Sequence, residues 1–478
     1  MNQVLVLAIV IIVLLRDALD APVLGGAMGP GWVVALSLVP MAALVGLNLI
    51  AGAIACRAMD RTGRTRAASA AHAVESVMRV LAVAWHAVAV LGLGFLDQIR
   101  SAIGDWILMD EAIAVAPPLL VFVSGWWAGY SIDRRIREAV LLRCLDRGQP
   151  IHPLASRGEF LLAAIRHHLL IVLVPAALIV AWSEAVNLAF SSWAEPSWRV
   201  VEAMVGAVQA AGVLAIFIVM PLILRVVWHT SPLPPGRLRD RLVVLCRSHG
   251  VRMRDLLVWR TGGTIPNGAV MGLIGRVRYI LLTDALLEGL SERQIEAVTA
   301  HEVAHVRHRH LIWLAAAVIA TVGATGEVVL RIWSASGGPE AGDWGVAISI
   351  GVGLAAGLGA LGFVSRRFEW QSDAFAARHL SASALEADEP AEPGRITARG
   401  AGEMGDALGA VAWLCGMKRE RFSFRHGSIA QRQRRLRALV GLDGDALPID
   451  RQVAAVKIAT ALLVAAWLGM SGAGLIWS

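Results

Sequence analysis

The sequence predicts a polytopic α-helical membrane protein with about eight or nine spans and a cytoplasmic α+β domain. Of its 478 residues, 56% are hydrophobic and 17% are charged, and the mean hydropathy is +0.62. Soluble chains are typically about 45–50% apolar and about 25% charged. Many apolar stretches approach the roughly 20 residues that cross a bilayer, and two long polar segments leave room for a folded domain. A disordered chain, a collagen and a single soluble domain are excluded.

Eight apolar stretches are candidate spans. A ninth, Val4–Leu15, is shorter and predicts either a first span or an interfacial helix; a cleaved signal peptide is disfavoured because no positive side chain precedes it. The eight candidates are Gly31–Cys56, Val80–Leu96, Ala112–Ser131, His168–Ser183, Val200–Leu224, Leu311–Trp333, Trp344–Val364 and Val453–Trp477.

The charges of the loops predict the orientation. Arginines cluster after Cys56 and after Ser131, whereas the intervening loops are richer in acidic residues. By the positive-inside rule the arginine loops face the cytoplasm, which also places Arg225–His310 and Ser365–Gln452 there. The net charge of +7 follows from this bias, so it does not indicate a nucleic-acid partner. We expect a multi-pass protein of the inner or plasma membrane.

The first polar segment predicts a mixed fold. We expect a helix over Leu238–Ser248 and strands over Asp255–Arg260 and Val277–Thr283. A capping box, Ser291–Gln294, begins a helix that we expect to run through His310 into the next span.

The second polar segment predicts helices around one loop. A helix is expected over Ser365–His379, followed by a loop rich in alanine, glutamate, proline and glycine over Ser381–Gly405. Two further helices are expected over Asp406–Arg419 and Ile429–Leu439.

The helix expected after Ser291 contains the pattern HExxH at residues 301–305. Residues four apart lie on one helix face, about 6 Å apart along the axis. That spacing lets His301 and His305 bind one tetrahedral zinc ion, while Glu302 on the adjacent face reaches a metal-bound water. Further histidines just after the motif leave open a simpler alternative, an amphipathic helix with histidines at the membrane surface.

A catalytic zinc ion needs a third protein ligand. The metzincin pattern requires glycine at 308 and histidine at 311, but the chain has His308 and Leu311. A distant carboxylate remains, and Glu369 lies one helical turn before Asp373. By itself this pair better suits a charged helical face at the exit from the membrane.

Four blocks of sequence together resemble the HtpX and CAAX prenyl endopeptidase family of integral-membrane zinc metallopeptidases, which are HExxH gluzincins. The resemblance covers about Arg225 to Leu439. The blocks are Pro266-Asn267 before a strand, Leu286-Leu287 through Ser291 into the HExxH motif, Ser365-Arg366 through Glu369 and Asp373-Ala374, and His426-x-Ser428-Ile429-x-x-Arg432.

The resemblance implies a zincin-type metallopeptidase domain with one zinc ion per chain. It implies His301, His305 and Glu369 as zinc ligands and Glu302 as the general base. It also implies that Asp373 orients a ligating histidine, that His426 lies near the transition-state oxyanion and that Arg432 supports the site. Pro266 and Asn267 would begin an edge strand that binds extended substrate.

Two positions depart from the family pattern. Gly427 replaces the usual proline, which questions the rigidity of the loop around His426. Gly268 replaces the usual alanine, so Asn267-Gly268 could instead form a hairpin turn.

These observations predict a division of the chain. Residues 1–224 form an N-terminal multi-span region, 225–310 and 365–452 the two halves of the peptidase domain, 311–364 a two-span hairpin and 453–478 a last span. The expected activity is hydrolysis of peptide bonds in membrane or membrane-proximal proteins at a cytoplasmic site. The alternatives are a signal-sensing metallopeptidase that cleaves a regulator, and an inactive scaffold or transporter. The partners are then a protein substrate and the lipid bilayer, and the oligomeric state stays open.

Overall fold

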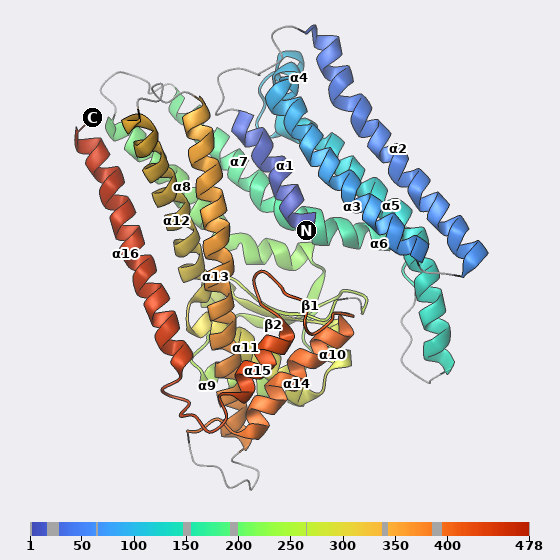
Figure 1. Ribbon diagram of the computed structural model, residues 1–478, viewed down its shortest axis with the longest axis vertical. Coiled ribbons are helices and arrows are strands. Elements are labelled where there is room, and N and C mark those ends of the chain that lie inside the picture. Colours follow the sequence, from blue (N-terminus) through green and yellow to red (C-terminus); the bar gives the residue numbers. More distant parts are fainter. Residues whose placement is uncertain are drawn as a thin grey trace. The chain divides into compact units, whose positions relative to one another are not determined.

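The structure is a computed structural model that describes residues 2–16, 28–63, 66–146, 154–191, 199–263, 265–336, 343–384 and 394–477 (Figure 1). It divides into two compact units, Met1–His229 and Thr230–Ser478. Among the described residues, eight helices are long and apolar enough to cross a membrane. The predicted polytopic α-helical fold is therefore confirmed.

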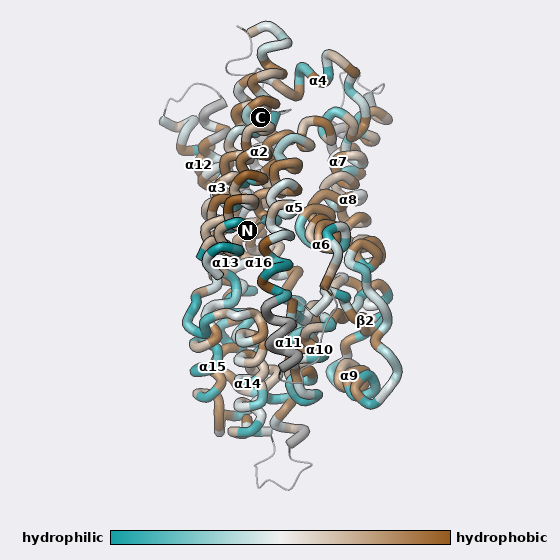
Figure 2. The backbone as a smooth tube through the Cα atoms, turned by 90° about the vertical axis from the view of Figure 1, so that its right-hand side faces the viewer, coloured by the Kyte–Doolittle hydropathy of each residue, from teal (hydrophilic) through white to brown (hydrophobic). Residues whose placement is uncertain are grey.

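Every secondary-structure element in the described part of the first unit is a helix. Five of its helical segments have the length of a span, whereas α1 has 15 residues and is shorter. Residues along α2 and α3 are mostly hydrophobic (Figure 2). The elements are α1 (Asn2–Arg16), α2 (Pro30–Thr62), α3 (Arg66–Ala87) continued by the π-helical turn Val88–Gly92, α4 (Phe95–Ile103), α5 (Met109–Asp146), α6 (Arg157–Ala164) continued by the π-helical segment Ile165–Leu170, α7 (Ile171–Phe190) and α8 (Arg199–Val227).

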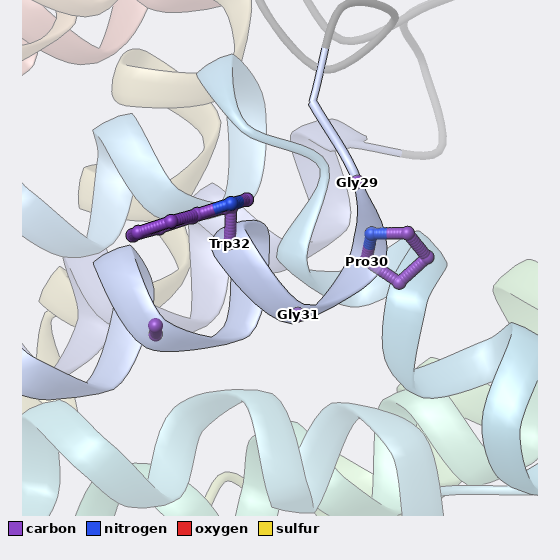
Figure 3. Close-up of a pocket in the computed structure, with 5 residues that line it drawn as sticks. Gly29, Pro30, Gly31 and Trp32 are labelled. Carbon is purple, nitrogen blue, oxygen red and sulfur yellow. The ribbon is translucent and has the colours of Figure 1, made fainter.

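The N-terminal end of α2 carries an exposed tryptophan. Pro30 occupies the first turn, where its missing N–H costs nothing, and Trp32 projects from the helix beside Gly29 and Gly31 (Figure 3). The hollow at this point is open and is lined by small or apolar residues, so it offers no chemistry. The exposed indole suits a membrane interface.

The second unit combines a small sheet with helices. Its helices are α9 (Arg237–Ser248), α10 (Asp284–Gly289), α11 (Glu292–Arg307), α12 (His310–Ala335), α13 (Asp343–Ala384), α14 (Ala398–Leu414), α15 (Ile429–Arg437) and α16 (Pro448–Trp477). The helices α12, α13 and α16 pack against one another (Figure 1). Hydrophilic residues are frequent on α9 and α15 (Figure 2).

The sheet has four strands in the order β1-β2-β4-β3. The strands are β1 (Thr230–Pro232), β2 (Asp255–Trp259), β3 (Gly268–Met271) and β4 (Tyr279–Thr283). β2 and β4 are parallel, whereas β1 and β3 run antiparallel to their neighbours. β2 and β4 match the two predicted strands, and β3 lies at the sheet edge next to α11.

The helix that carries the HExxH motif ends before the next span begins, so the prediction of one continuous helix through His310 is wrong. The capping box at Ser291 and Gln294 forms as predicted, but α11 ends at Arg307. Arg309 adopts the left-handed conformation with φ 54°, which terminates a helix. The break redirects the chain, and the ring of His310 stacks on Phe368 of α13 with a centroid distance of 4.2 Å.

The predicted loop over Ser381–Gly405 is also partly wrong. α13 continues to Ala384, and α14 begins at Ala398; residues 385–393 lie outside the described part of the chain. Thr397 caps α14 by accepting a hydrogen bond from the Gly400 N–H. Most glycines and alanines of this helix are buried against the core, so tertiary packing outweighs the low helix propensity of its glycines.

Candidate metal centre

Two histidines of α11 face each other one helical turn apart. Nε2 of His301 lies 3.3 Å from Nε2 of His305. His301 is buried and His305 partly buried. The helix that carries them is fixed by its apolar face, which includes Ile295, Ala300 and Val303 in the main core of this unit.

Glu369 of α13 completes a cluster of three donor groups. Its Oε2 lies 3.5 Å from Nε2 of His301, and its Oε1 lies 3.7 Å from Nε2 of His305. Glu369 is buried. Among the described residues, these three form the group whose ligand atoms all lie within 4.8 Å of one another.

The three groups fit a zinc ion. With Zn–N and Zn–O distances of about 2.0–2.1 Å, two ligands of a tetrahedral ion are about 3.3 Å apart, which agrees with the distance between the two histidine nitrogens. When both imidazoles are unprotonated at Nε2, each of the three atoms has a lone pair, and a cation at their centre would bind all three. Two imidazoles and one carboxylate also form a known donor set of catalytic zinc.

Asp373 and Arg432 contact two residues of this cluster, His301 and Glu369. Arg432 donates two hydrogen bonds to Asp373, from Nε at 2.8 Å and from Nη2 at 2.6 Å. Asp373 Oδ1 lies 3.0 Å from Nδ1 of His301, and Arg432 Nη1 lies 3.3 Å from Oε2 of Glu369. A carboxylate next to Nδ1 favours the tautomer of His301 that leaves a lone pair on Nε2.

Burial and neighbouring charges shift the pKa values of the two histidines in opposite directions. Burial lowers the pKa of His301, but the carboxylates of Asp373 and Glu369 outweigh burial and raise that pKa to about 10. Burial lowers the pKa of His305 to about 3, so this ring is neutral and can act as a ligand. Asp373 and Glu369 overcome the burial of Arg432 and raise its pKa above the ordinary value.

Glu302 lies on the neighbouring face of α11, next to the edge strand β3. A Cβ atom built on Gly268 would lie 3.7 Å from Cγ of Glu302 and 2.8 Å from Cγ1 of Val298. Burial raises the pKa of Glu302 to about 7. The close approach explains why a glycine suits position 268.

His426 reaches the cluster from an exposed loop. Its Nδ1 lies 2.8 Å from Oε1 of Glu369, and about half of its side chain is exposed. Gly427 has φ 73°, which proline cannot adopt. Gly427 N–H donates to the Ser423 carbonyl, and Ser423 N–H donates to the Gly427 carbonyl, so this turn is closed by the backbone.

Pro266 and Asn267 lie directly before β3. Asn267 exchanges hydrogen bonds with Thr283, whose N–H donates to the Asn267 carbonyl at 3.0 Å. β3 begins at Gly268, which lacks a positive φ. The hairpin turn considered for Asn267-Gly268 is therefore not formed.

The sequence analysis did not predict a role for three further residues, His310, Gln371 and Asp450. His310 Nδ1 lies 3.1 Å from Nδ1 of His305, and His310 Nε2 contacts Gln371. Gln371 in turn donates to Asp450. No signal in the sequence joins these positions, because the contacts arise from the chain break at Arg309 and from the packing of α16.

Comparison with known protein families identifies the domain that carries the donor cluster. Residues 235–422 match the sequence model of the family described as Peptidase family M48. The part of the chain that holds the three ligand residues therefore resembles this family, in agreement with the sequence blocks that lie within residues 235–422.

Two further similarities concern single proteins. Over 60 residues the chain is 35% identical to the plastoglobule-localized metallopeptidase 48, chloroplastic, of Arabidopsis thaliana. That alignment covers 13% of this chain and 17% of that protein, so the chain spans less than a fifth of this curated relative. The crystal structure of S. mikatae Ste24p is similar with a TM-score of 0.44 and 14% identity, over 87% of this chain and all of that one.

Proposed function

We propose that the protein is a zinc-dependent endopeptidase that hydrolyses peptide bonds of membrane or membrane-proximal proteins. The observation that carries the proposal is the convergence of His301, His305 and Glu369 within 4.8 Å. The domain would comprise residues 225–310 and 365–452, separated by the hairpin 311–364. The distribution of arginines in the loops supports a cytoplasmic site.

Each residue has a role in the proposed reaction. His301, His305 and Glu369 would hold one zinc ion, which acts as a Lewis acid toward the scissile carbonyl and activates water. Glu302 takes the proton of the attacking water and passes it to the leaving amine. In this reaction the imidazole of His426 turns from Glu369 and donates a hydrogen bond to the developing oxyanion.

The edge strand supports the binding of an extended substrate. Within the described sheet, β3 pairs with β4 on one side only, and it runs beside α11 near Glu302. An extended peptide can add to such an edge through backbone hydrogen bonds. Asn267 fixes the start of this strand through its hydrogen bonds with Thr283, and Pro266 directly precedes it, so the two residues would set the position of the strand.

The membrane helices support a substrate close to the bilayer. α12 begins three residues after the end of α11, and the described part of α13 carries both membrane-length apolar sequence and Glu369. A peptide must therefore reach the donor cluster within a few turns of the apolar segments.

The test compares wild type with Glu302→Gln in detergent. Both proteins are assayed for bound zinc and for cleavage of unfolded casein. We expect zinc in both and a kcat about 10²–10⁴-fold lower in the variant, because the proton acceptor is lost while the ligands remain. Glu292→Gln is a matched control, since Glu292 is exposed on the same helix. Equal cleavage by wild type and Glu302→Gln would refute the proposal.

A further inference from the structure

A chain of polar side chains connects the proposed zinc ligand His305 to the C-terminal helix α16. His305 Nδ1 lies 3.1 Å from His310 Nδ1. His310 Nε2 lies 2.8 Å from Gln371 Oε1, and Gln371 Nε2 lies 2.5 Å from Asp450 Oδ1. His310 and Gln371 are buried. The four residues come from α11, α12, α13 and α16.

The carboxylate of Asp450 fixes the direction of every hydrogen bond in this chain. An ionised carboxylate only accepts, and Asp450 lies in the first turn of α16, where the helix dipole stabilises negative charge. Gln371 must therefore direct its NH₂ group to Asp450 and its carbonyl oxygen to His310. That carbonyl accepts, so His310 donates from Nε2.

The same logic determines the state of His305. A neutral imidazole that donates from one nitrogen accepts at the other, so His310 Nδ1 accepts the Nδ1–H of His305. The hydroxyl of Ser372, 3.5 Å from His310 Nδ1, can also donate to that nitrogen. Nε2 of His305 is left with a lone pair directed at His301 and Glu369.

The ring of His310 cannot easily turn to reverse this order. It stacks on Phe368 with a centroid distance of 4.2 Å and an interplanar angle of 5°. A second contact fixes the same junction, since Lys457 of α16 donates to the His308 carbonyl at 2.9 Å. Asp373 is adjacent to Nδ1 of His301 directly, whereas the carboxylate that governs His305 is two side chains away.

We propose that Asp450 is a positioning residue that sets the tautomer of His305 through Gln371 and His310, so that Nε2 is presented as a zinc ligand. This inference rests on the proposed zinc site. It gives α16 a role in the chemistry in addition to its role as a span. Groups that orient metal ligands typically affect metal affinity by about 10- to 100-fold.

The first experiment substitutes Asp450→Asn in the full chain purified in detergent. The amide has nearly the shape of the carboxylate, but it can also donate a hydrogen bond. Gln371 and His310 can then exchange their donor and acceptor roles along the chain. Reversal puts the proton of His305 on Nε2. We expect the zinc affinity to fall about 10- to 100-fold. At an unchanged rate of zinc binding, zinc then passes to a competing chelator faster by the same factor, with the thermal unfolding midpoint little changed.

A double variant separates hydrogen-bond direction from other effects of position 450. Gln371→Glu combined with Asp450→Asn exchanges the carboxylate and the amide. The acceptor-only group then contacts His310 directly, and the amide introduced at position 450 donates to that group. We expect this double variant to recover the wild-type rate of zinc release.

The outcomes separate this inference from the proposed function. Asp445→Asn, at an exposed aspartate just before α16, is the matched control and should release zinc as wild type does. Unchanged release from Asp450→Asn, or fast release from the double variant, would overturn the inference while the zinc site stands. A wild-type protein without zinc would overturn the proposed function and this inference with it.

Discussion

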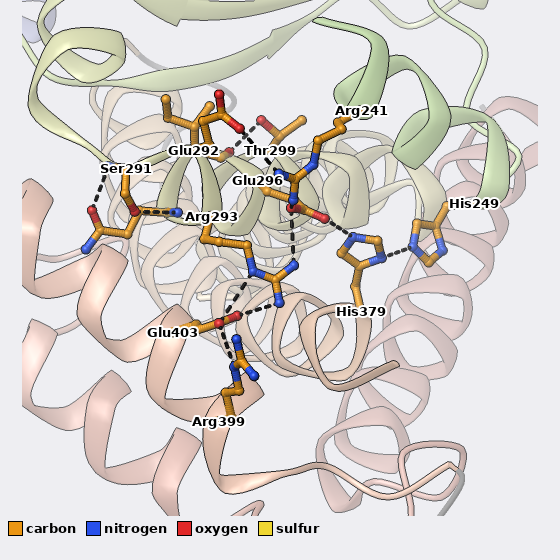
Figure 4. A network of polar contacts seen from close by, with 12 residues as sticks. Arg241, His249, Ser291, Glu292, Arg293, Glu296, Thr299, His379, Arg399 and Glu403 are labelled. Carbon is orange, nitrogen blue, oxygen red and sulfur yellow. Dashed lines mark hydrogen bonds and ion pairs between the residues drawn. The ribbon is translucent and has the colours of Figure 1, made fainter. Parts of the chain in front are cut away.

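Two polar clusters join the same pair of helices, and they differ in how donors and acceptors are arranged. The donor cluster joins His301 and His305 of α11 to Glu369 of α13. A second cluster, which we call the clamp, joins Glu296 of α11 to His379 of α13 and consists of Arg241, His249, Arg293, Glu296 and His379 (Figure 4).

In the clamp every acceptor faces a donor. His379 Nε2 lies 3.2 Å from Oε1 of Glu296, and Oε2 of Glu296 accepts from Arg241 and from Arg293. His379 Nδ1 lies 3.0 Å from Nε2 of His249. Burial raises the pKa of Glu296, but His379 and the arginines outweigh burial and lower it below its usual value.

In the donor cluster the acceptors face one another. His301 Nε2, His305 Nε2 and the Glu369 carboxylate converge. Asp373 and His310 contact the Nδ1 atoms of the two rings, and Arg432 and His426 contact the carboxylate. Both clusters use histidine and glutamate on the same helices. Residue type alone therefore does not define a metal site, whereas converging lone pairs do.

The largest effect on zinc binding should come from removing one of the three proposed metal ligands. His305→Ala leaves two donors, so we expect loss of bound zinc and of casein cleavage, with the fold retained because His305 is only partly buried. Metal analysis of the purified protein provides the measurement. Zinc at the wild-type level in this variant would contradict the assignment of the donor cluster.

A substitution in the clamp should lower stability and leave zinc binding intact. Glu296→Gln removes the charge that pairs with two arginines and His379, and hydrogen bonds to charged groups contribute about 1.5–3 kcal/mol. Because the arginines are partly exposed, we expect a loss of stability near the lower end, with zinc retained. Thermal unfolding and zinc content, measured on one preparation, test this; zinc loss with unchanged stability would reverse the comparison.

The clamp should also show a dependence on pH. The folded-state pKa of Glu296 is lowered, so its contribution to stability is fully present above the unfolded pKa of about 4.3 and is lost as pH falls through the folded value. The difference in unfolding midpoint between wild type and Glu296→Gln should hold from pH 7 to about 5 and then shrink. A difference in unfolding midpoint that grows as the pH falls would contradict the lowered pKa of Glu296.

The smallest effect is expected in the loop that carries His426. Gly427→Ala places a Cβ at φ 73°, which costs about 1–2 kcal/mol. We expect unchanged zinc content and a modest loss of kcat, because the loop only presents His426 to the donor cluster. A kinetic comparison with wild type at equal zinc occupancy measures this, and loss of zinc would show that the loop instead supports the ligands.

Local patterns in the sequence predicted much of this protein. Eight apolar stretches predicted the eight membrane-length helices found among the described residues, since the apolar composition of each stretch can be read without knowledge of its contacts. The capping box at Ser291 and the spacing of His301 and His305 follow from helix periodicity. Glu369, His426 and Arg432 needed the family resemblance, because nothing local connects them to the motif.

The tertiary structure decided the rest. The left-handed turn at Arg309, which the apolar pattern hides, turns His310 toward α13. His310 and Gln371 are 61 residues apart, and Gln371 and Asp450 are 79 apart. Hydrogen bonds over such separations depend on how three helices pack, so the sequence determined the ligand pair, whereas the fold determined the side chains that orient it.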